Sequence, residues 1–279
     1  MQNPDDEKFL YSVGTRLGGP RRPSGLEEIA AQVNWTLFAG FVAVLAIALY
    51  ACRFSAYLGI ATFVFVLVGW LFSLTLHEFS HAAVAFLSGD RSYSTRRYLT
   101  GNPLNYLHPV LSILLPLVFV LLGGFGLPGG AVYLQSGLIR SPGRRSAVSA
   151  AGPAANLVCL LVLAVLYSEG LRFGFLGFGA LAAVAFLAFL QGTAILLNLL
   201  PIPGLDGYGV IEPFLSYSIR QSFEVIRPYG FIIIFVLFFF VPPFRDWFFG
   251  LVSQGLAAIN IDPFLVRAGY GDFRFWIRQ

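Results

Sequence analysis

The chain has 279 residues, of which 57% are hydrophobic and only 11% are charged, and its formal net charge is +4. Soluble globular domains carry about 25% charged residues, and disordered chains combine low hydrophobicity with high charge, so both classes are excluded. The composition indicates an integral membrane protein. Its basic residues fall in short connections between apolar runs, as is usual beside a membrane, and we therefore expect no nucleic-acid partner.

A polar stretch, residues 1–32, precedes the apolar runs. It is too long and too acidic for the n-region of a cleaved signal peptide, so we expect the first apolar run to be a retained anchor. A helix rises 1.5 Å per residue, so about 20 apolar residues cross a bilayer core of about 30 Å. The runs cover residues 33–51, 57–88, 106–124, 147–167, 173–200 and 229–241, the last continuing weakly to 258.

These runs predict the fold class, an all-α polytopic membrane bundle of about six apolar segments. No connection is long enough for an inserted soluble domain, so residues 33–258 are expected to form one membrane domain and residues 259–279 a short C-terminal tail. Two local features stand out. Prolines and glycines interrupt residues 106–124, which we expect to be re-entrant or deeply kinked, and residues 130–135 have the pattern of a short interfacial strand.

The second apolar run contains ionisable residues, which cost about 2.5–3.5 kcal/mol for each charged group at the bilayer centre on insertion scales. His77 and His81 are four residues apart and share one face of a helix, with Glu78 beside them. In this HExxH pattern two histidines bind zinc, and the glutamate is the general base toward the zinc-bound water. The alternative, a polar patch that pairs with neighbouring helices, is less favoured because ionisable residues inside a membrane are usually functional.

A catalytic zinc site needs a third protein ligand, with the fourth position left to water. The candidates downstream are His108, Asp206 and Glu212. Asp206 follows two prolines and a glycine that break the end of the fifth run, and broken backbone at membrane depth is tolerated where it is buried in protein or lines a wet cavity. A carboxylate at such a break can turn toward a metal. The alternative is an ordinary turn at the membrane edge, with a solvated Asp206.

Three motifs in this order resemble those of the site-2 protease family (peptidase family M50), the intramembrane zinc metalloproteases. They are His77-Glu-Phe-Ser-His81, Gly152-Pro-Ala-Ala-Asn156 and Asn198-Leu-Leu-Pro-Ile-Pro-Gly-Leu-Asp206-Gly207. The similarity is greatest to a compact branch of the family without PDZ or CBS domains. Where that branch usually has His-x-Asp-Pro, this chain has Tyr106-Leu-His108-Pro109. For His108 we therefore favour a local hydrogen-bonding role over the alternative of an extra metal ligand or proton shuttle.

The resemblance implies one zinc ion held by the two histidines and Asp206, with Glu78 as the catalytic residue. It also implies that Asn198 and Asn156 contact the substrate or stabilise the oxyanion. An amide suits that task because it donates hydrogen bonds to developing charge without carrying a charge itself. For either asparagine the alternative is a structural hydrogen bond between helices.

The predicted function is hydrolysis of peptide bonds in or near the transmembrane segments of membrane proteins, that is, regulated intramembrane proteolysis. The resemblance implies single-pass regulators or signal-peptide remnants as substrates, and a multi-pass location in a prokaryotic cell membrane, within the lipid bilayer. The alternative is a non-proteolytic zinc-binding membrane transporter or scaffold. A transporter would spread its ionisable residues along several helices, and a scaffold would not need Glu78.

The chemistry constrains the topology. If every run crossed the membrane once, the HExxH helix and the run before Asp206 would be antiparallel, and their motifs would lie toward opposite faces. A re-entrant segment at 106–124 makes the two helices parallel and brings the motifs level. The distribution of basic residues predicts a cytoplasmic N-terminus in both arrangements.

Overall fold

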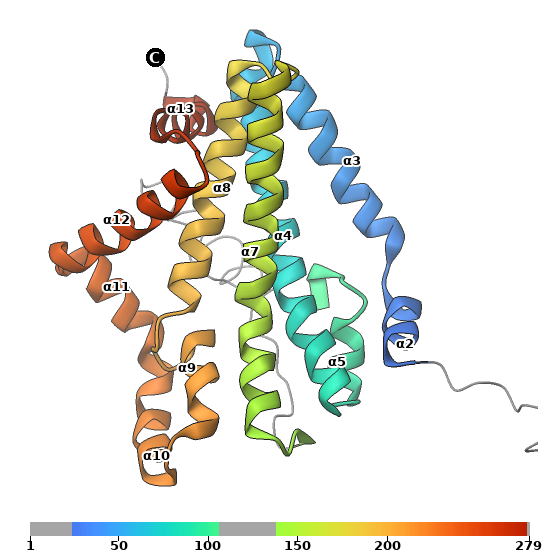
Figure 1. Ribbon diagram of the computed structural model, residues 1–279, viewed down its shortest axis with the longest axis vertical. Coiled ribbons are helices and arrows are strands. Elements are labelled where there is room, and N and C mark those ends of the chain that lie inside the picture. The colour runs from blue at the N-terminus through green and yellow to red at the C-terminus, as the bar shows by residue number, and fades with distance from the viewer. Residues whose placement is uncertain (1–23, 106–137, 278–279) are drawn as a thin grey trace, which may run out of the picture.

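The computed structural model describes residues 24–105 and 138–277, and these two ranges contain helices and no strand (Figure 1). The predicted strand at 130–135, the segment 106–124 and His108 lie outside the described residues. The α-helices are α2 (Gly25–Gln32), α3 (Trp35–Ala51), α4 (Leu58–Ser88), α5 (Tyr93–Tyr98), α7 (Pro142–Phe173), α8 (Phe178–Asn198), α9 (Asp206–Ile211), α10 (Tyr217–Ile226), α11 (Gly230–Phe240), α12 (Pro242–Ala258) and α13 (Pro263–Phe273). Short 3-10 helices are η1 (Ser55–Tyr57), η2 (Pro103–Asn105), η5 (Glu212–Phe214), η6 (Arg227–Tyr229) and η7 (Phe275–Ile277).

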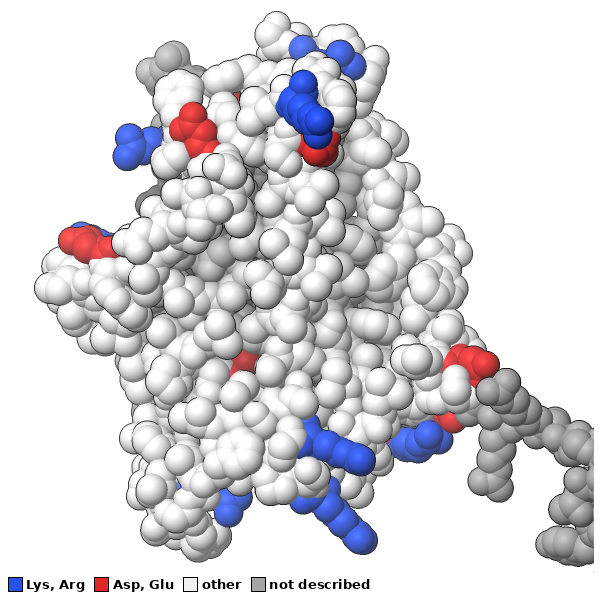
Figure 2. Space-filling view, in the orientation of Figure 1, with Lys and Arg blue, Asp and Glu red and all other residues white. Residues whose placement is uncertain are grey.

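Three helices are long and apolar enough to cross a membrane by themselves: α4 with the preceding η1, α7 and α8. Three pairs of helices meet the same condition together but are bent, α2–α3 by 64°, α10–α11 by 68° and α12–α13 by 113°. Charged side chains lie mostly toward the ends of the molecule, and its middle is nearly free of them on the face shown in Figure 2. The prediction of an all-α polytopic membrane bundle is confirmed for the described residues, which give three spans, or up to six if each bent pair is one span.

Helix α8 is the centre of the bundle, because α4, α7, α12 and α13 all pack against it. Its first half contains fully buried alanines, whose small side chains let helix backbones approach closely in a membrane. They are Ala180, Ala182, Ala183, Ala185 and Ala188. A Cβ atom at Gly269 of α13 would collide with the carbonyl oxygen of Ala182, so α13, within residues 259–279, packs directly on the α8 backbone.

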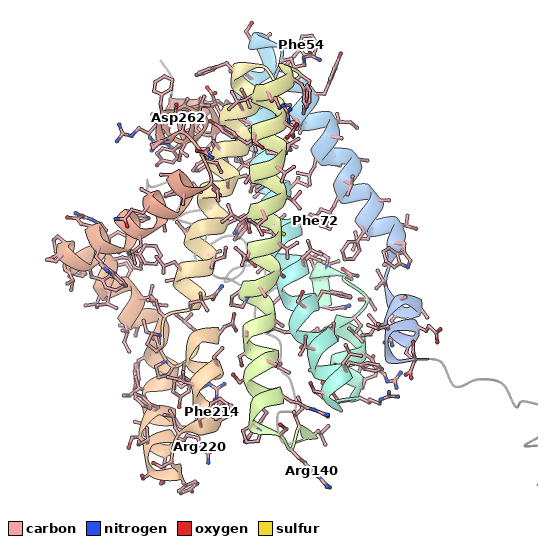
Figure 3. All side chains as sticks on the ribbon, in the orientation of Figure 1. Phe54, Phe72, Arg140, Phe214, Arg220 and Asp262 are labelled. Carbon is pink, nitrogen blue, oxygen red and sulfur yellow. The ribbon has the colours of Figure 1, made fainter. Side chains whose placement is uncertain are left out.

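The direction of the central helices decides where the motifs can meet. Helices α4 and α8 run the same way, and α7 runs in the opposite direction (Figure 1). Figure 3 marks the two ends of the bundle: Phe54, between α3 and α4, lies at one end, and Arg140, just before α7, lies at the other with Arg220 of α10. The HExxH helix and the helix before Asp206 are therefore parallel, as they must be for both motifs to lie at one level.

Candidate metal centre

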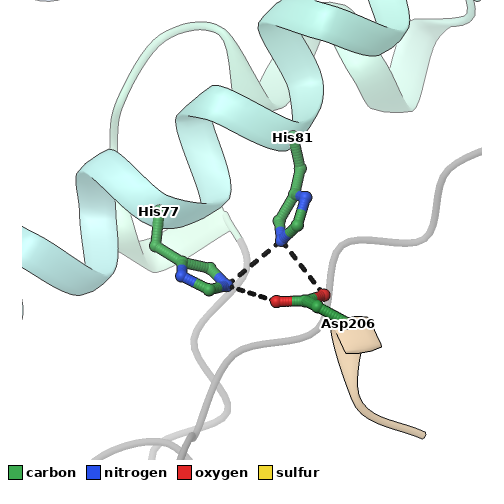
Figure 4. A group of neighbouring side chains, drawn as sticks. All are labelled: His77, His81 and Asp206. Atoms are coloured by element: carbon green, nitrogen blue, oxygen red, sulfur yellow. Dashed lines mark hydrogen bonds and ion pairs between the residues drawn. The ribbon is translucent and has the colours of Figure 1, made fainter. Parts of the chain in front are cut away.

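Two histidines on one face of α4 form the first part of the site (Figure 4). His77 and His81 are both buried, and their Nε2 atoms are 3.1 Å apart. This approach follows from the spacing of four residues, which stacks side chains one above the other along a helix. Helix α4 continues beyond His81 to Ser88 and ends at Gly89, whose φ of 115° makes it the left-handed cap that commonly ends a helix. Both histidines thus lie inside a long, regular helix.

Helix α7 fixes the orientation of both imidazoles. The Nδ1 atom of His77 lies 2.8 Å from Asn156 Oδ1, and the Nδ1 atom of His81 lies 2.7 Å from the carbonyl oxygen of Val148. A carbonyl oxygen can only accept, so each Nδ1 carries the proton and donates it, and in the neutral ring each Nε2 keeps its lone pair. Histidines that bind metals usually donate their second ring N–H to a carbonyl or carboxylate in this way.

Gly152 lies on the same face of α7, one turn from Val148 and one turn from Asn156. A Cβ atom at this position would collide with the Nε2 atoms of both His77 and His81. Glycine therefore allows α7 to cover the histidine pair closely while leaving the Nε2 side free of a side chain. In the sequence, Gly152 is recognisable only as part of a motif, but its spacing of four residues from Asn156 puts both residues on one helix face.

The break after α8 brings the aspartate to the histidines. Gly204 has a φ of 101°, a backbone conformation that glycine adopts without strain. Helix α9 then begins at Asp206, and Gly207 packs so tightly that a Cβ atom would collide with the carbonyl oxygens of Leu199 and Leu200. The reversal therefore returns the chain to the end of α8 and sets Asp206 beside α4.

The three side chains converge on one point. Asp206 Oδ2 lies 3.0 Å from His77 Nε2, and Asp206 Oδ1 lies 3.3 Å from His81 Nε2 (Figure 4). The ligand atoms of the three residues all lie within 4.8 Å of one another, and they are a possible metal-binding group. Their side chains differ in exposure, 7% and 8% for the histidines and 21% for the aspartate. The cluster is thus most open on the side of Asp206.

The donor set fits a zinc ion. Both Nε2 atoms keep a lone pair, as shown above, and the buried Oδ2 atom of Asp206 accepts no hydrogen bond from the described residues. Three acceptor groups without a proton between them repel one another unless a cation lies among them. Imidazole nitrogen and carboxylate oxygen are common zinc ligands, and three protein ligands are typical of a catalytic zinc site.

The other predicted site residues lie in different positions around this cluster. Glu78 follows His77 on α4 and is only 3% exposed, and within residues 24–105 and 138–277 no hydrogen bond or ion pair holds its carboxylate. Asn198 is buried at the last residue of α8, directly before the break that leads to Asp206. Asn156 contacts His77 itself, which is the structural role that the sequence left open beside substrate binding.

Comparison with known proteins adds to this picture of a membrane protein with a His-His-Asp metal site. The chain is 46% identical over 221 residues to the "Putative zinc metalloprotease Rip2" of Mycolicibacterium smegmatis. The matched region covers 79% of this chain and 83% of that protein. The protein of the same name from Mycobacterium tuberculosis H37Rv is 44% identical over the same length. The "Putative zinc metalloprotease YwhC" of Bacillus subtilis is 30% identical over 181 residues, 62% of this chain and 80% of that protein. No family model and no solved structure matches the chain.

The fold and the site define a zinc metalloprotease embedded in a membrane. The chain belongs to the family of the Rip2 zinc metalloproteases. Zinc is accordingly its metal, and the cluster of His77, His81 and Asp206 could hold it.

Proposed function

We propose that this chain is an intramembrane protease of the site-2 protease type, which hydrolyses peptide bonds in or near the transmembrane segments of other membrane proteins. One observation carries the proposal: the His-His-Asp cluster and Glu78 are enclosed by α4, α7 and the end of α8, helices long enough to cross a membrane. Ionisable groups are costly at this place, and a protease that cleaves only soluble peptides has no need to bury them there.

In this proposal His77, His81 and Asp206 hold the zinc ion. When bound, zinc polarises the scissile carbonyl and lowers the pKa of water, which makes water a nucleophile at neutral pH. The hydrogen bonds from Nδ1 to α7 keep both imidazoles turned toward the ion. Gly152 lets α7 pack directly on both rings, where any larger side chain would collide with their Nε2 atoms.

Glu78 is the general base. Its carboxylate is buried on α4 directly after His77, and we assign it the role of taking a proton from the attacking water. It then delivers this proton to the leaving amine. Asn198 is a buried amide at the end of α8, and it is the proposed donor of a hydrogen bond to the substrate or to the oxyanion. The NH2 group of Asn156 is a second candidate donor.

The burial of the site supports a transmembrane substrate. A transmembrane helix ties up its carbonyls in i→i−4 hydrogen bonds, so it must unwind before a peptide bond can reach the cluster. We propose that it approaches from the side of Asp206, where the cluster is most open. Single-pass regulators and signal-peptide remnants are the proposed substrates, and the bacterial origin of the relatives supports a location in a prokaryotic cell membrane.

The variant Glu78→Gln tests this function. The amide has nearly the same size but cannot accept the proton, so cleavage should fall by about 10²- to 10⁴-fold while the zinc content stays at one ion per chain. Zinc is measured by elemental analysis of the purified protein, and cleavage by proteomics of membrane proteins that accumulate uncut in a strain carrying the variant.

Glu169→Gln is the matched control, because Glu169 lies far along α7 from the cluster and pairs only loosely with Arg172, at 4.0 Å. It should leave cleavage unchanged. A Glu78→Gln protein that binds zinc and keeps full biological activity would contradict the protease and favour a zinc-binding transporter or scaffold.

A further inference from the structure

A polar bridge joins α4 and α8 inside the apolar core. Gln191 of α8 donates a hydrogen bond from Nε2 to Ser73 Oγ of α4 at 2.8 Å, and Ser73 in turn donates to the carbonyl oxygen of Trp70 at 2.9 Å. Gln191 is 1% exposed and Ser73 is 3% exposed. The reaction proposed above uses neither residue.

The bridge lies close to the metal site along α4 and two turns before the end of α8. Ser73 precedes His77 by four residues, so it is one turn away on the face that carries both histidines. Gln191 precedes Asn198 by seven residues, two turns before the end of α8 and the break that leads to Asp206. The bridge therefore connects the helix of the histidines with the helix whose end sets the position of the aspartate.

Close packing continues from the bridge away from the site. Gly69 is one turn before Ser73, and Leu187 is one turn before Gln191. A Cβ atom at Gly69 would lie 2.5 Å from the Cδ2 atom of Leu187, so the two helices touch here in the same register as at the bridge. Apolar packing of this kind holds helices together, but it has little directionality along the helix axis. The hydrogen bond, in contrast, pairs one residue of α8 with one residue of α4.

Stability alone does not account for the glutamine. Its Oε1 atom is buried and has no hydrogen-bond partner among the described residues, which is costly. Hydrogen bonds between membrane helices add little stability on average, and an apolar side chain of the same length would leave no acceptor unpaired. Buried polar groups of this kind are best known for fixing the register of helices.

We propose that Gln191 is a positioning residue, which through Ser73 sets α8 against α4 so that Asp206 meets His77 and His81. The inference rests on the proposed function insofar as these three residues hold the zinc ion. A slip of α8 by one residue would move its end by 1.5 Å and turn it by 100°. Either change would separate Asp206 from the histidines, so the hydrogen bond controls the geometry of the donor set from one turn before His77 on α4 and two turns before the end of α8.

The test compares zinc affinity with the stability of the zinc-free protein. Gln191→Met keeps the length of the side chain and removes the hydrogen bond, and Ser73→Ala removes only a hydroxyl group. The full-length protein is purified in detergent micelles. Competition with a chelator gives the zinc dissociation constant, and thermal unfolding without metal gives the melting temperature.

We expect the zinc dissociation constant to rise about three- to tenfold in Gln191→Met and in Ser73→Ala, the range that a hydrogen bond between membrane helices spans. The double variant should bind zinc no more weakly than Gln191→Met alone, because both substitutions remove the same hydrogen bond. The zinc-free melting temperature should stay equal or rise. Thr193→Val is the matched control: Thr193 is fully buried on the same helix, and its hydroxyl donates to Leu190 of α8 itself, at 2.8 Å.

An unchanged zinc dissociation constant in Gln191→Met and Ser73→Ala would overturn the inference, and so would an equal weakening in Thr193→Val. Asp206→Asn in the same assay separates the two proposals. If Asp206→Asn keeps the affinity of the wild type, the assignment of the zinc ligands fails. If it loses zinc while Gln191→Met and Ser73→Ala do not, only the role of Gln191 is rejected.

Discussion

The histidine half of the cluster and the aspartate half are built in different ways. His77 and His81 lie within the 31-residue helix α4, and each is held by a hydrogen bond from its Nδ1 atom to α7. Asp206 is the first residue of the six-residue helix α9 and is more exposed than either histidine. Gly204 and Gly207 place it through backbone conformation and close packing.

This difference indicates how each half responds to change. The histidines are oriented by directional hydrogen bonds, so removal of a partner should loosen a ring without moving the helix. The aspartate is placed by the path of the backbone, so a substitution there should move the whole ligand. Three substitutions around the cluster test this contrast, and all are read out as the zinc dissociation constant of the purified protein.

Gly207→Ala should have the largest effect. The added Cβ atom would meet the carbonyl oxygens of Leu199 and Leu200, and because these are backbone atoms at the end of α8, the start of α9 has to move instead. Overpacking of this kind costs about 1–3 kcal/mol, so we expect zinc affinity to fall by up to about a hundredfold. Gly250→Ala on α12 is the control, because a Cβ atom there has no atom within 4 Å. Wild-type zinc affinity in Gly207→Ala would contradict this, because it would show that Asp206 still reaches the metal after the start of α9 has moved.

Asn156→Ala should have the next largest effect. It removes the acceptor that His77 Nδ1 contacts at 2.8 Å, and loss of such a partner typically lowers metal affinity about 10- to 100-fold. We expect a value near tenfold, because α4 still holds the backbone of His77. Asn156→Asp keeps an acceptor oxygen and should restore most of the affinity. Equal losses in Asn156→Ala and Asn156→Asp would mean that the contact does not orient the ring.

Much of the fold could be predicted because the apolar runs are long. The run 57–88 corresponds to α4, and 173–200 contains α8. The run 147–167 falls short of α7 at both ends, because hydropathy detects the part of a helix that suits lipid, and α7 continues beyond it. At its start, Ser141 and Pro142 supply the N-cap and first helical residue typical of a helix N-terminus, ahead of two arginines.

Only part of the site could be predicted from the sequence. A spacing of four residues put His77 and His81 on one face, and the break after residue 198 singled out Asp206, whose side chain the structure places beside them. The partner of His81 could not be found in this way. It is the main-chain carbonyl of Val148, a group that every residue carries, so the type of residue at position 148 gives no sign of this hydrogen bond. Pairing across α4 and α7 depends on how the helices pack, which the order of the motifs does not specify.

Val148→Ala should therefore have the smallest effect on the metal, although Val148 is as close to the site as Asn156. Its carbonyl oxygen lies 2.7 Å from His81 Nδ1 and is retained in the variant, so we expect zinc affinity to change by less than about twofold. The side chain packs in one buried cluster with Ala85 and Ile139, and its truncation should cost about 1 kcal/mol of stability, measured by thermal unfolding. A loss of affinity near tenfold would mean that packing at position 148, rather than the carbonyl, orients His81. The histidine half would then depend on the placement of the backbone as much as the aspartate half does.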